Sequence, residues 1–124
     1  MKRSIKSPNA PTPIGPYSQA VVAGAVYCSG QIGIDPKTGN LEAGIVKETS
    51  RALSNLDAVL GAEGMNLANV VKTTVFMVDL SEFSSMNEEY ARHFNPPFPS
   101  RSTIQAAALP KGARVEIDAV AVPD

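Results

Sequence analysis

The chain has 124 residues, a length that suits one compact domain. Eleven basic and twelve acidic side chains leave a formal net charge of −1, which argues against a dedicated nucleic-acid-binding domain because such domains are normally basic. The single cysteine, Cys28, excludes an internal disulfide, and the single histidine, His93, excludes a zinc site built from His and Cys. We therefore expect one domain over residues 1–124 in a reducing, intracellular setting.

We expect no secretory signal and no membrane-spanning segment in the sequence. No apolar run approaches the ~20 residues that a membrane-spanning helix needs. The basic N-terminus lacks the apolar stretch of a secretory signal. No acidic residue precedes Asp35, as in mitochondrial presequences, but Pro8, Pro11, Pro13 and Pro16 would break the helix that such a segment forms. We expect a cytoplasmic location, with a mitochondrial one as the alternative.

Short strands and turns are predicted for the first third of the chain. Residues 1–16 are proline-rich and are expected to be extended. Residues 18–22 and 25–30 are predicted strands, joined by a turn at Ala23-Gly24. Residues 35–40 place a proline and a glycine near opposite ends, which is typical of a turn.

From residue 43 to residue 62 the hydrophobic pattern takes the period of a helix. Its apolar stripe is expected to comprise Ile45, Val46, Thr49, Ala52, Leu53, Leu56, Val59 and Leu60. Its polar side is expected to carry Lys47, Glu48, Arg51, Ser54, Asn55 and Asp57. Gly61 and Gly64 supply the end of the helix, because glycine readily adopts the backbone conformation that follows one.

A strand and a second helix are predicted next. Residues 70–78 are β-branched and apolar on both alternating faces, which indicates a strand covered on both sides. In the helix that follows, Ser85 and Glu88 are spaced as a capping box, and Asn95-Pro96-Pro97 ends it. The inner face of this helix is expected to comprise Phe83, Met86, Tyr90 and Phe94.

The last two strands are expected near residues 101–109 and 113–122, joined by a hairpin loop at Pro110-Lys111-Gly112. The predicted order is β-β-β-α-β-α-β-β, in which the third strand is short. This is an α+β fold in which two helices cover one face of a single sheet of about six strands. No element remains to cover the other face, so the pattern also indicates self-association.

Two uncharged side chains are candidates for binding a ligand. Asn87 falls within the apolar stripe of the second predicted helix. A buried amide needs hydrogen-bond partners, so Asn87 is expected to bind either the backbone of a loop or a ligand. Tyr17 follows the rigid approach Ile14-Gly15-Pro16, which could aim its ring at a pocket; simple packing is the alternative.

Arg101 is the main charged candidate, and it shares one face of its predicted strand with Thr103 and Gln105. A guanidinium matches a carboxylate in a two-pronged geometry, which makes arginine a favoured anchor for small organic acids. The alternatives are an arginine exposed at the strand end, or one paired with Glu116 or Asp118. Glu116 itself alternates with apolar neighbours, a pattern that a solvent-facing sheet surface explains equally well.

Several common catalytic motifs are absent. The sequence contains neither of the phosphate-binding patterns GxxxxGK[ST] and GxGxxG. His93 falls late in a predicted helix without a nucleophile elbow, so a Ser-His-Asp triad is not supported. Cys28 is interpreted as a small core residue rather than a thiolate nucleophile.

Five separated segments together resemble one known family. They are residues 14–20 (IGPYSQA), 29–32 (SGQI), 71–75 (VKTTV), 98–102 (FPSRS) and 109–119, in which LPKG is followed by VEIDA. In this order and at this spacing they are similar to the RidA/YjgF family of reactive-intermediate (enamine/imine) deaminases, which are also labelled translation inhibitors or L-PSP endoribonucleases. The similarity extends over nearly the whole chain.

The resemblance implies a chorismate-mutase-like fold and a homotrimer with ligand clefts between its subunits. It also implies hydrolytic deamination of 2-imino and 2-enamino acids, such as 2-iminopropanoate and 2-aminoacrylate, which are released by pyridoxal-phosphate-dependent dehydratases. The products would be 2-keto acids and ammonia. No metal and no organic cofactor is implied, and the expected ligand is a small acid rather than RNA or a membrane.

The resemblance assigns roles to individual residues. Arg101 matches the arginine that holds the substrate carboxylate. Glu116 matches the glutamate that positions or activates the attacking water. Tyr17 matches a tyrosine that lines the cleft, and Asn87 matches an asparagine near it.

Three further positions complete the expected site. Ser29 and Gly30 match residues that fix the ligand by side chain and backbone. Many bacterial members carry a cysteine where this chain has Thr103, so a mechanism that needs a thiol there would fail. Thr103 is expected to line the cleft or to contact the ligand through its backbone.

Two other functions compete with imine hydrolysis. An endoribonuclease would normally use paired acid and base groups and a basic track, for which one histidine and a net charge of −1 give little support. The other alternative is a non-catalytic module that binds small acids, or a holdase-like partner. In such a module Arg101 would bind the ligand, and no turnover would follow.

Overall fold

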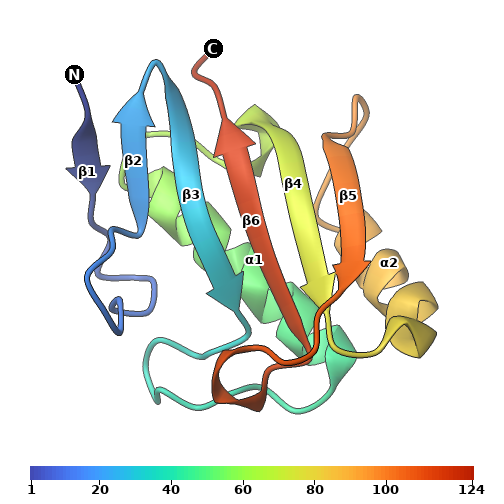
Figure 1. The fold of residues 1–124 in the computed structure, drawn as a ribbon. Coiled ribbons are helices and arrows are strands. Elements are labelled where there is room, and N and C mark those ends of the chain that lie inside the picture. The colour runs from blue at the N-terminus through green and yellow to red at the C-terminus, as the bar shows by residue number, and fades with distance from the viewer.

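One mixed sheet of six strands organises the chain, and the computed structural model describes all residues from 1 to 124. The strand order across the sheet is β1-β2-β3-β6-β4-β5 (Figure 1). Strands β4 and β5 pair in parallel, and all other neighbours are antiparallel. The predicted α+β class and single six-stranded sheet are confirmed. The strands are β1 (Arg3–Ile5), β2 (Ala20–Ala23), β3 (Ala25–Ile32), β4 (Val70–Met77), β5 (Ser100–Gln105) and β6 (Val115–Ala121).

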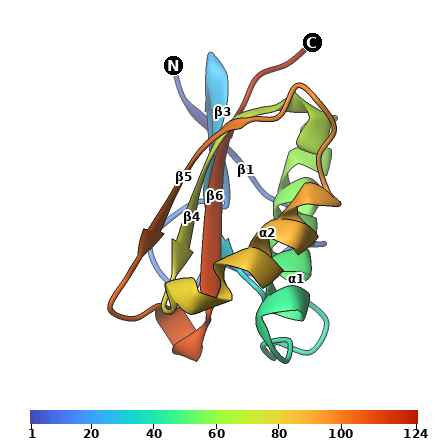
Figure 2. The same ribbon diagram turned by 90° about the vertical axis from the view of Figure 1, so that its right-hand side faces the viewer.

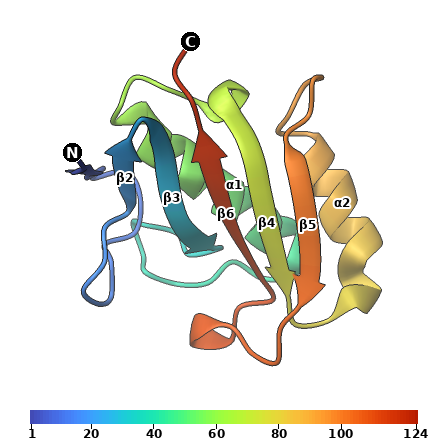
Figure 3. The ribbon, with the colours of Figure 1, turned by 45° about the horizontal axis from the view of Figure 1, so that its top comes forward.

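Two helices, α1 (Ile45–Gly61) and α2 (Phe83–Ala91), cover one face of the sheet (Figure 2). The core lies between these two layers. Figure 3 shows the other face of the sheet, with both helices behind it; we call this the open face. The core includes Leu53, Leu56, Met77, Met86, Val115 and Ile117, all of them fully buried. Three short 3-10 turns are η1 (Leu67–Asn69), η2 (Leu80–Glu82) and η3 (Pro110–Gly112).

The predicted hairpin between the last two strands is wrong. Strand β6 pairs with β3 and β4, whereas β5 pairs with the other edge of β4 and lies at the end of the sheet. The reason is that β4, α2 and β5 form a crossover unit, in which a helix joins two parallel strands. The segment at Pro110–Gly112 therefore forms the turn η3 on the connection that carries the chain past β4.

The N-terminal region contains a strand that the sequence analysis did not predict. Residues Arg3–Ile5 form β1, which pairs with β2. The short third strand that was expected before the first helix is reduced to a single bridge between Ile34 and Leu41. Neither detail was readable from the sequence, because a strand of three residues has too short an alternation to show a period.

Helix α1 begins and ends close to the predicted positions, but three residues differ from the prediction in their burial. Val46 was placed in the apolar stripe and is exposed. Glu48 and Asn55 were placed on the polar side and are buried. The segment that follows β3 covers this side of the helix: Asn55 Nδ2 donates to the carbonyl oxygens of Ile32 and Ile34 at 3.2 and 2.9 Å.

Helix α2 confirms part of its prediction. Met86, Tyr90 and Phe94 are buried, but Phe83 is exposed. The helix ends at Ala91, before the predicted stop at Asn95-Pro96-Pro97. The predicted capping box is wrong, because the residue before the helix is Glu82 and no side chain caps the helix start.

Strand β4 is buried on one face only. Thr73, Val75 and Met77 face the helices and are buried, whereas Thr74 and Phe76 are half-buried on the open face. A shift in register between Val70 and Lys72 leaves Val71 exposed. Cover for the open face by another copy of the chain stays a prediction. None of the helices is both long and apolar enough to cross a membrane.

Candidate functional site

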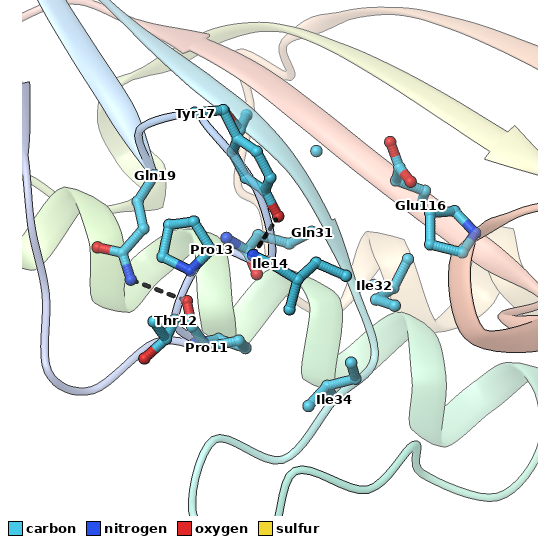
Figure 4. A pocket seen from close by; sticks show the side chains of 13 residues that line it. Pro11, Thr12, Pro13, Ile14, Tyr17, Gln19, Gln31, Ile32, Ile34 and Glu116 are labelled. Carbon is cyan, nitrogen blue, oxygen red and sulfur yellow. Dashed lines mark hydrogen bonds between the residues drawn. The ribbon is translucent and has the colours of Figure 1, made fainter.

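The first candidate site is a cavity of about 310 Å³ at one end of β3 (Figure 4). We call it the glutamate cavity because Glu116 of β6 lines it. It also contains three of the predicted site residues, Tyr17, Ser29 and Gly30. Its remaining lining comes from Pro11, Thr12, Pro13, Ile14, Gln19, Gln31, Ile32, Ile34 and Pro110.

Residues 11–14, within the proline-rich segment 8–16, form one wall of the glutamate cavity, and Gln19 fixes this segment in place. Prolines have no backbone N–H, so such a segment cannot hold itself together by its own backbone hydrogen bonds. The buried Gln19 amide donates to the carbonyl oxygens of Pro11 at 2.9 Å and Ser7 at 3.1 Å, and it accepts from Ser7 N at 2.6 Å. Tyr17 closes the loop, because its hydroxyl accepts from Ile14 N at 3.3 Å (Figure 4).

The Glu116 carboxyl lies directly against the backbone of β3. A Cβ atom added at Gly30 would lie 2.8 Å from Glu116 Cδ, so only glycine leaves room for this side chain. Burial raises the pKa of Glu116, and the nearby charge of Asp118 raises it further. Beside it, Ser29 Oγ donates to the Ser18 carbonyl at 2.6 Å, which ties the strand to the loop that carries Tyr17.

The second candidate site is a cavity of about 390 Å³ between α2 and the start of β5. We call it the arginine cavity because Arg101 forms one wall. Asn87 also lines it, and its residue is half-buried rather than enclosed in the core. The other lining residues are Tyr90, Ala91, Phe98 and Pro99.

Arg101 differs from the other arginines in having no acidic partner within the chain. Its side chain is half-buried, and Cζ lies 4.7 Å from the centre of the Tyr90 ring. The predicted alternative of an ion pair with Glu116 or Asp118 is wrong, because those two side chains lie on the other face of the sheet. The four paired arginines are Arg3 with Glu63, Arg51 with Glu42, Arg92 with Glu88 and Glu89, and Arg114 with Glu82.

The two cavities lie on opposite faces of the sheet. Arg101 is in register with Thr73 of β4, which is buried beneath the helices. Glu116 is in register with Phe76, which lies on the open face. Within one chain the predicted residues therefore form two groups. The glutamate cavity holds Tyr17, Ser29, Gly30 and Glu116; the arginine cavity holds Asn87 and Arg101.

Thr103 lines neither cavity. It follows Arg101 on the same face of β5, half-buried and in register with Val75. Sequence reasoning also missed two residues that shape the cavities. The sequence places Gln19 in a predicted strand and Tyr90 in the core; an amide that can both donate and accept beside prolines without N–H groups is chemically suited to anchor them, but no spacing marks it.

Comparisons with known proteins identify the family of the chain. The family model described as Endoribonuclease L-PSP matches residues 7–123. The chain belongs to this family. The human 2-iminobutanoate/2-iminopropanoate deaminase is 48% identical over 124 residues, which cover 98% of this chain and 90% of the relative. The resemblance to the RidA/YjgF proteins is thereby confirmed.

Solved structures of family members have the same fold. RidA from the Antarctic bacterium Psychrobacter sp. PAMC 21119 superposes with a TM-score of 0.94 at 40% identity, covering 98% of this chain and 99% of that one. Escherichia coli TdcF, solved with bound serine, superposes with a TM-score of 0.93 at 38% identity, with the same coverage.

Proposed function

We propose that the chain hydrolyses 2-imino acids of the 2-iminobutanoate and 2-iminopropanoate class to 2-keto acids and ammonia. The observation that carries the proposal is Arg101, an arginine without a carboxylate partner in the wall of a cavity. The relatives named for this activity match almost the whole chain, which supports the same conclusion. TdcF binds serine, a small acid that also bears a carboxylate.

The guanidinium of Arg101 binds the substrate carboxylate through two parallel N–H donors. This contact orients the C=N carbon, so the main contribution of Arg101 is to place the reacting group. Asn87 supplies a free amide beside it for a second polar contact. The imine is already electrophilic, so the reaction needs no metal or organic cofactor.

Glu116 holds the attacking water and takes up one of its protons. The oxygen of that water forms a bond to the imine carbon, and the carboxyl passes the proton to the imine nitrogen, which gives a carbinolamine. The carboxylate then takes the proton of the carbinolamine hydroxyl and delivers it to the amino nitrogen, the C–N bond breaks, and ammonia leaves as the C=O bond of the 2-keto acid forms. A raised pKa suits this double role, because a carboxyl that is easier to protonate can both accept and return a proton.

We further propose that a second copy of the chain completes the site. Arg101 and Glu116 face opposite sides of the sheet, so one substrate cannot meet both within a single chain. Large apolar side chains are exposed beside both cavities, among them Ile14 and Tyr17 at one and Phe98 at the other. A homotrimer in which the glutamate cavity of one copy meets the arginine cavity of the next would bury them.

A coupled assay tests the proposed function. A dehydratase generates 2-aminoacrylate in the cuvette, and pyruvate release above the spontaneous rate is followed for the wild type and Arg101→Ala. We expect wild-type acceleration and its loss in Arg101→Ala, with an unchanged melting curve. Acceleration by the variant at the wild-type rate would overturn the role of Arg101. Binding of 2-oxobutanoate without any acceleration by the wild type would indicate a non-catalytic module.

The family description favours a second candidate, an endoribonuclease. Its support within the chain is weak, because His93 is bound to Glu89 at 3.0 Å within the α2 region and four of the five arginines are in ion pairs. RNA cleavage that co-purifies with the wild type through several columns, and that disappears in Arg101→Ala, would establish it.

A further inference from the structure

The Arg101 guanidinium rests on aromatic rings. Its Cζ lies 4.7 Å from the centre of the Tyr90 ring and 5.6 Å from the centre of the Phe83 ring. Both distances are within the range in which a cation is attracted to the face of an aromatic ring. A guanidinium that stacks on a ring by its flat face keeps N–H donors at its edge, where they can bind a carboxylate.

Tyr90 is held more firmly than Phe83. Its hydroxyl is hydrogen-bonded to Thr73 Oγ1 at 2.8 Å, and its ring lies 4.7 Å from that of Phe94 at an angle of 33°. Thr73 is buried and is the direct neighbour of Arg101 across the β4–β5 ladder. The support beneath Arg101 is therefore fastened to the strand beside it. Phe83, in contrast, is exposed at the first residue of α2.

We infer that Tyr90 is a positioning residue, which holds the guanidinium of Arg101 in the orientation that accepts a carboxylate in the arginine cavity. This inference rests on the proposed function, because it assumes that Arg101 binds the carboxylate of the substrate. An arginine side chain has many rotamers, and ordering it when the ligand binds reduces affinity. A ring that orders the guanidinium beforehand removes that penalty, so Tyr90 acts on binding rather than on the chemical step.

The test varies the ring and keeps the packing. Tyr90→Phe keeps the ring and removes the hydroxyl that binds Thr73. Progressively fluorinated phenylalanine at residue 90 then keeps the shape and withdraws negative charge from the ring face. We measure KM and kcat in the coupled assay and the dissociation constant of 2-oxobutanoate. With increasing fluorination, KM and the dissociation constant should rise by about three- to tenfold, while kcat changes little.

Tyr90→Leu and Phe94→Leu provide a matched pair. Both remove a buried ring from the same stack, but the structure records an Arg101 contact only for Tyr90. We expect Tyr90→Leu to weaken 2-oxobutanoate binding by at least about tenfold and Phe94→Leu to leave it within about twofold.

The outcomes separate the inference from the proposed function. If Arg101→Ala abolishes binding while KM is constant across the fluorinated series, Tyr90 is only a core residue and the inference is wrong. If Arg101→Ala keeps wild-type binding and activity, the proposed function fails. An equal loss in Tyr90→Leu and Phe94→Leu, with no trend in the fluorinated series, also overturns the inference.

Discussion

Because Gly30 has no side chain, the carboxyl of Glu116 can pack directly against the backbone of β3. Its backbone has no positive φ, so alanine is compatible with the local conformation. The Cβ atom of Gly30→Ala would collide with the end of the flexible Glu116 side chain, and the carboxyl would have to move. We expect kcat/KM to fall by about 10- to 100-fold with little change in melting temperature, because misplacing a reacting group costs rate rather than stability.

Gly61→Ala is the matched control, since a Cβ at Gly61 meets no atom within 4 Å. It should keep full activity. Wild-type kcat/KM in Gly30→Ala would show that the position of Glu116 does not matter.

Asp118 should tune the pH dependence of the reaction. Its charge raises the pKa of Glu116, second to burial. If the ionised carboxyl accepts the proton of water, kcat/KM rises with pH as Glu116 ionises, and the midpoint of that rise lies above the ordinary glutamate pKa. Asp118→Asn removes one cause of the raised pKa, so the midpoint should move to lower pH.

The asparagine keeps an oxygen that can accept from Thr74 N, as Asp118 Oδ1 does at 3.0 Å, so the local structure should persist. The pH profile of kcat/KM, corrected for spontaneous hydrolysis, is the measurement. A midpoint that stays in place or moves upward in Asp118→Asn contradicts the assignment.

At the level of elements, side-chain periodicity predicted the long helix, the strand at residues 70–78 and the first hairpin, because each has a period long enough to recognise. It could not predict which strands become neighbours. Strand β5 pairs with β4 across a helix, whereas β6, next in sequence, inserts between β3 and β4. The hairpin was predicted from Pro110-Lys111-Gly112, a turn sequence that fits many connections.

Helical periodicity also failed to predict that part of the polar side of α1 is buried. Helical period places Asn55 opposite the apolar stripe, but the chain after β3 returns over that side and requires a donor for its carbonyl groups. Asn55→Leu should lower the free energy of unfolding by about 1–3 kcal/mol, because the carbonyl groups of Ile32 and Ile34 lose their donor in a buried place.

Urea denaturation of Asn55→Leu, with the exposed neighbour Ser54→Ala as the control, measures this loss. A change in Asn55→Leu no larger than that of the control would show that solvent replaces the donor.

At the scale of the whole molecule, the candidate site residues could be assigned from the resemblance to a family. No sequence pattern reveals that these residues lie on two opposite faces of the sheet. The face on which Arg101 or Glu116 lies depends on how its strand pairs with β4, and this pairing follows from the strand order. Because Arg101 and Glu116 lie on opposite faces of the sheet, two inactive variants should complement each other when they are mixed. Arg101→Ala and Glu116→Ala should each be inactive, and a mixture that is unfolded and reassembled together should regain activity.

For a homotrimer assembled at random, about three-quarters of the trimers contain both variants and about one site in three of each is intact, so about a quarter of wild-type activity is expected. Size-exclusion chromatography with light scattering checks the assembly. A mixture that stays inactive while forming trimers of wild-type size would show that each site belongs to one chain.

The proline-rich wall of the glutamate cavity has a consequence for the speed of ligand capture. Prolines restrict the unfolded chain, and Gln19 fastens the segment from within, so little freedom is left to lose when a ligand arrives. A small acid then meets a surface that already has its final shape. Association should be limited by diffusion and orientation rather than by the closing of a loop, which suits the interception of short-lived molecules before they react with something else.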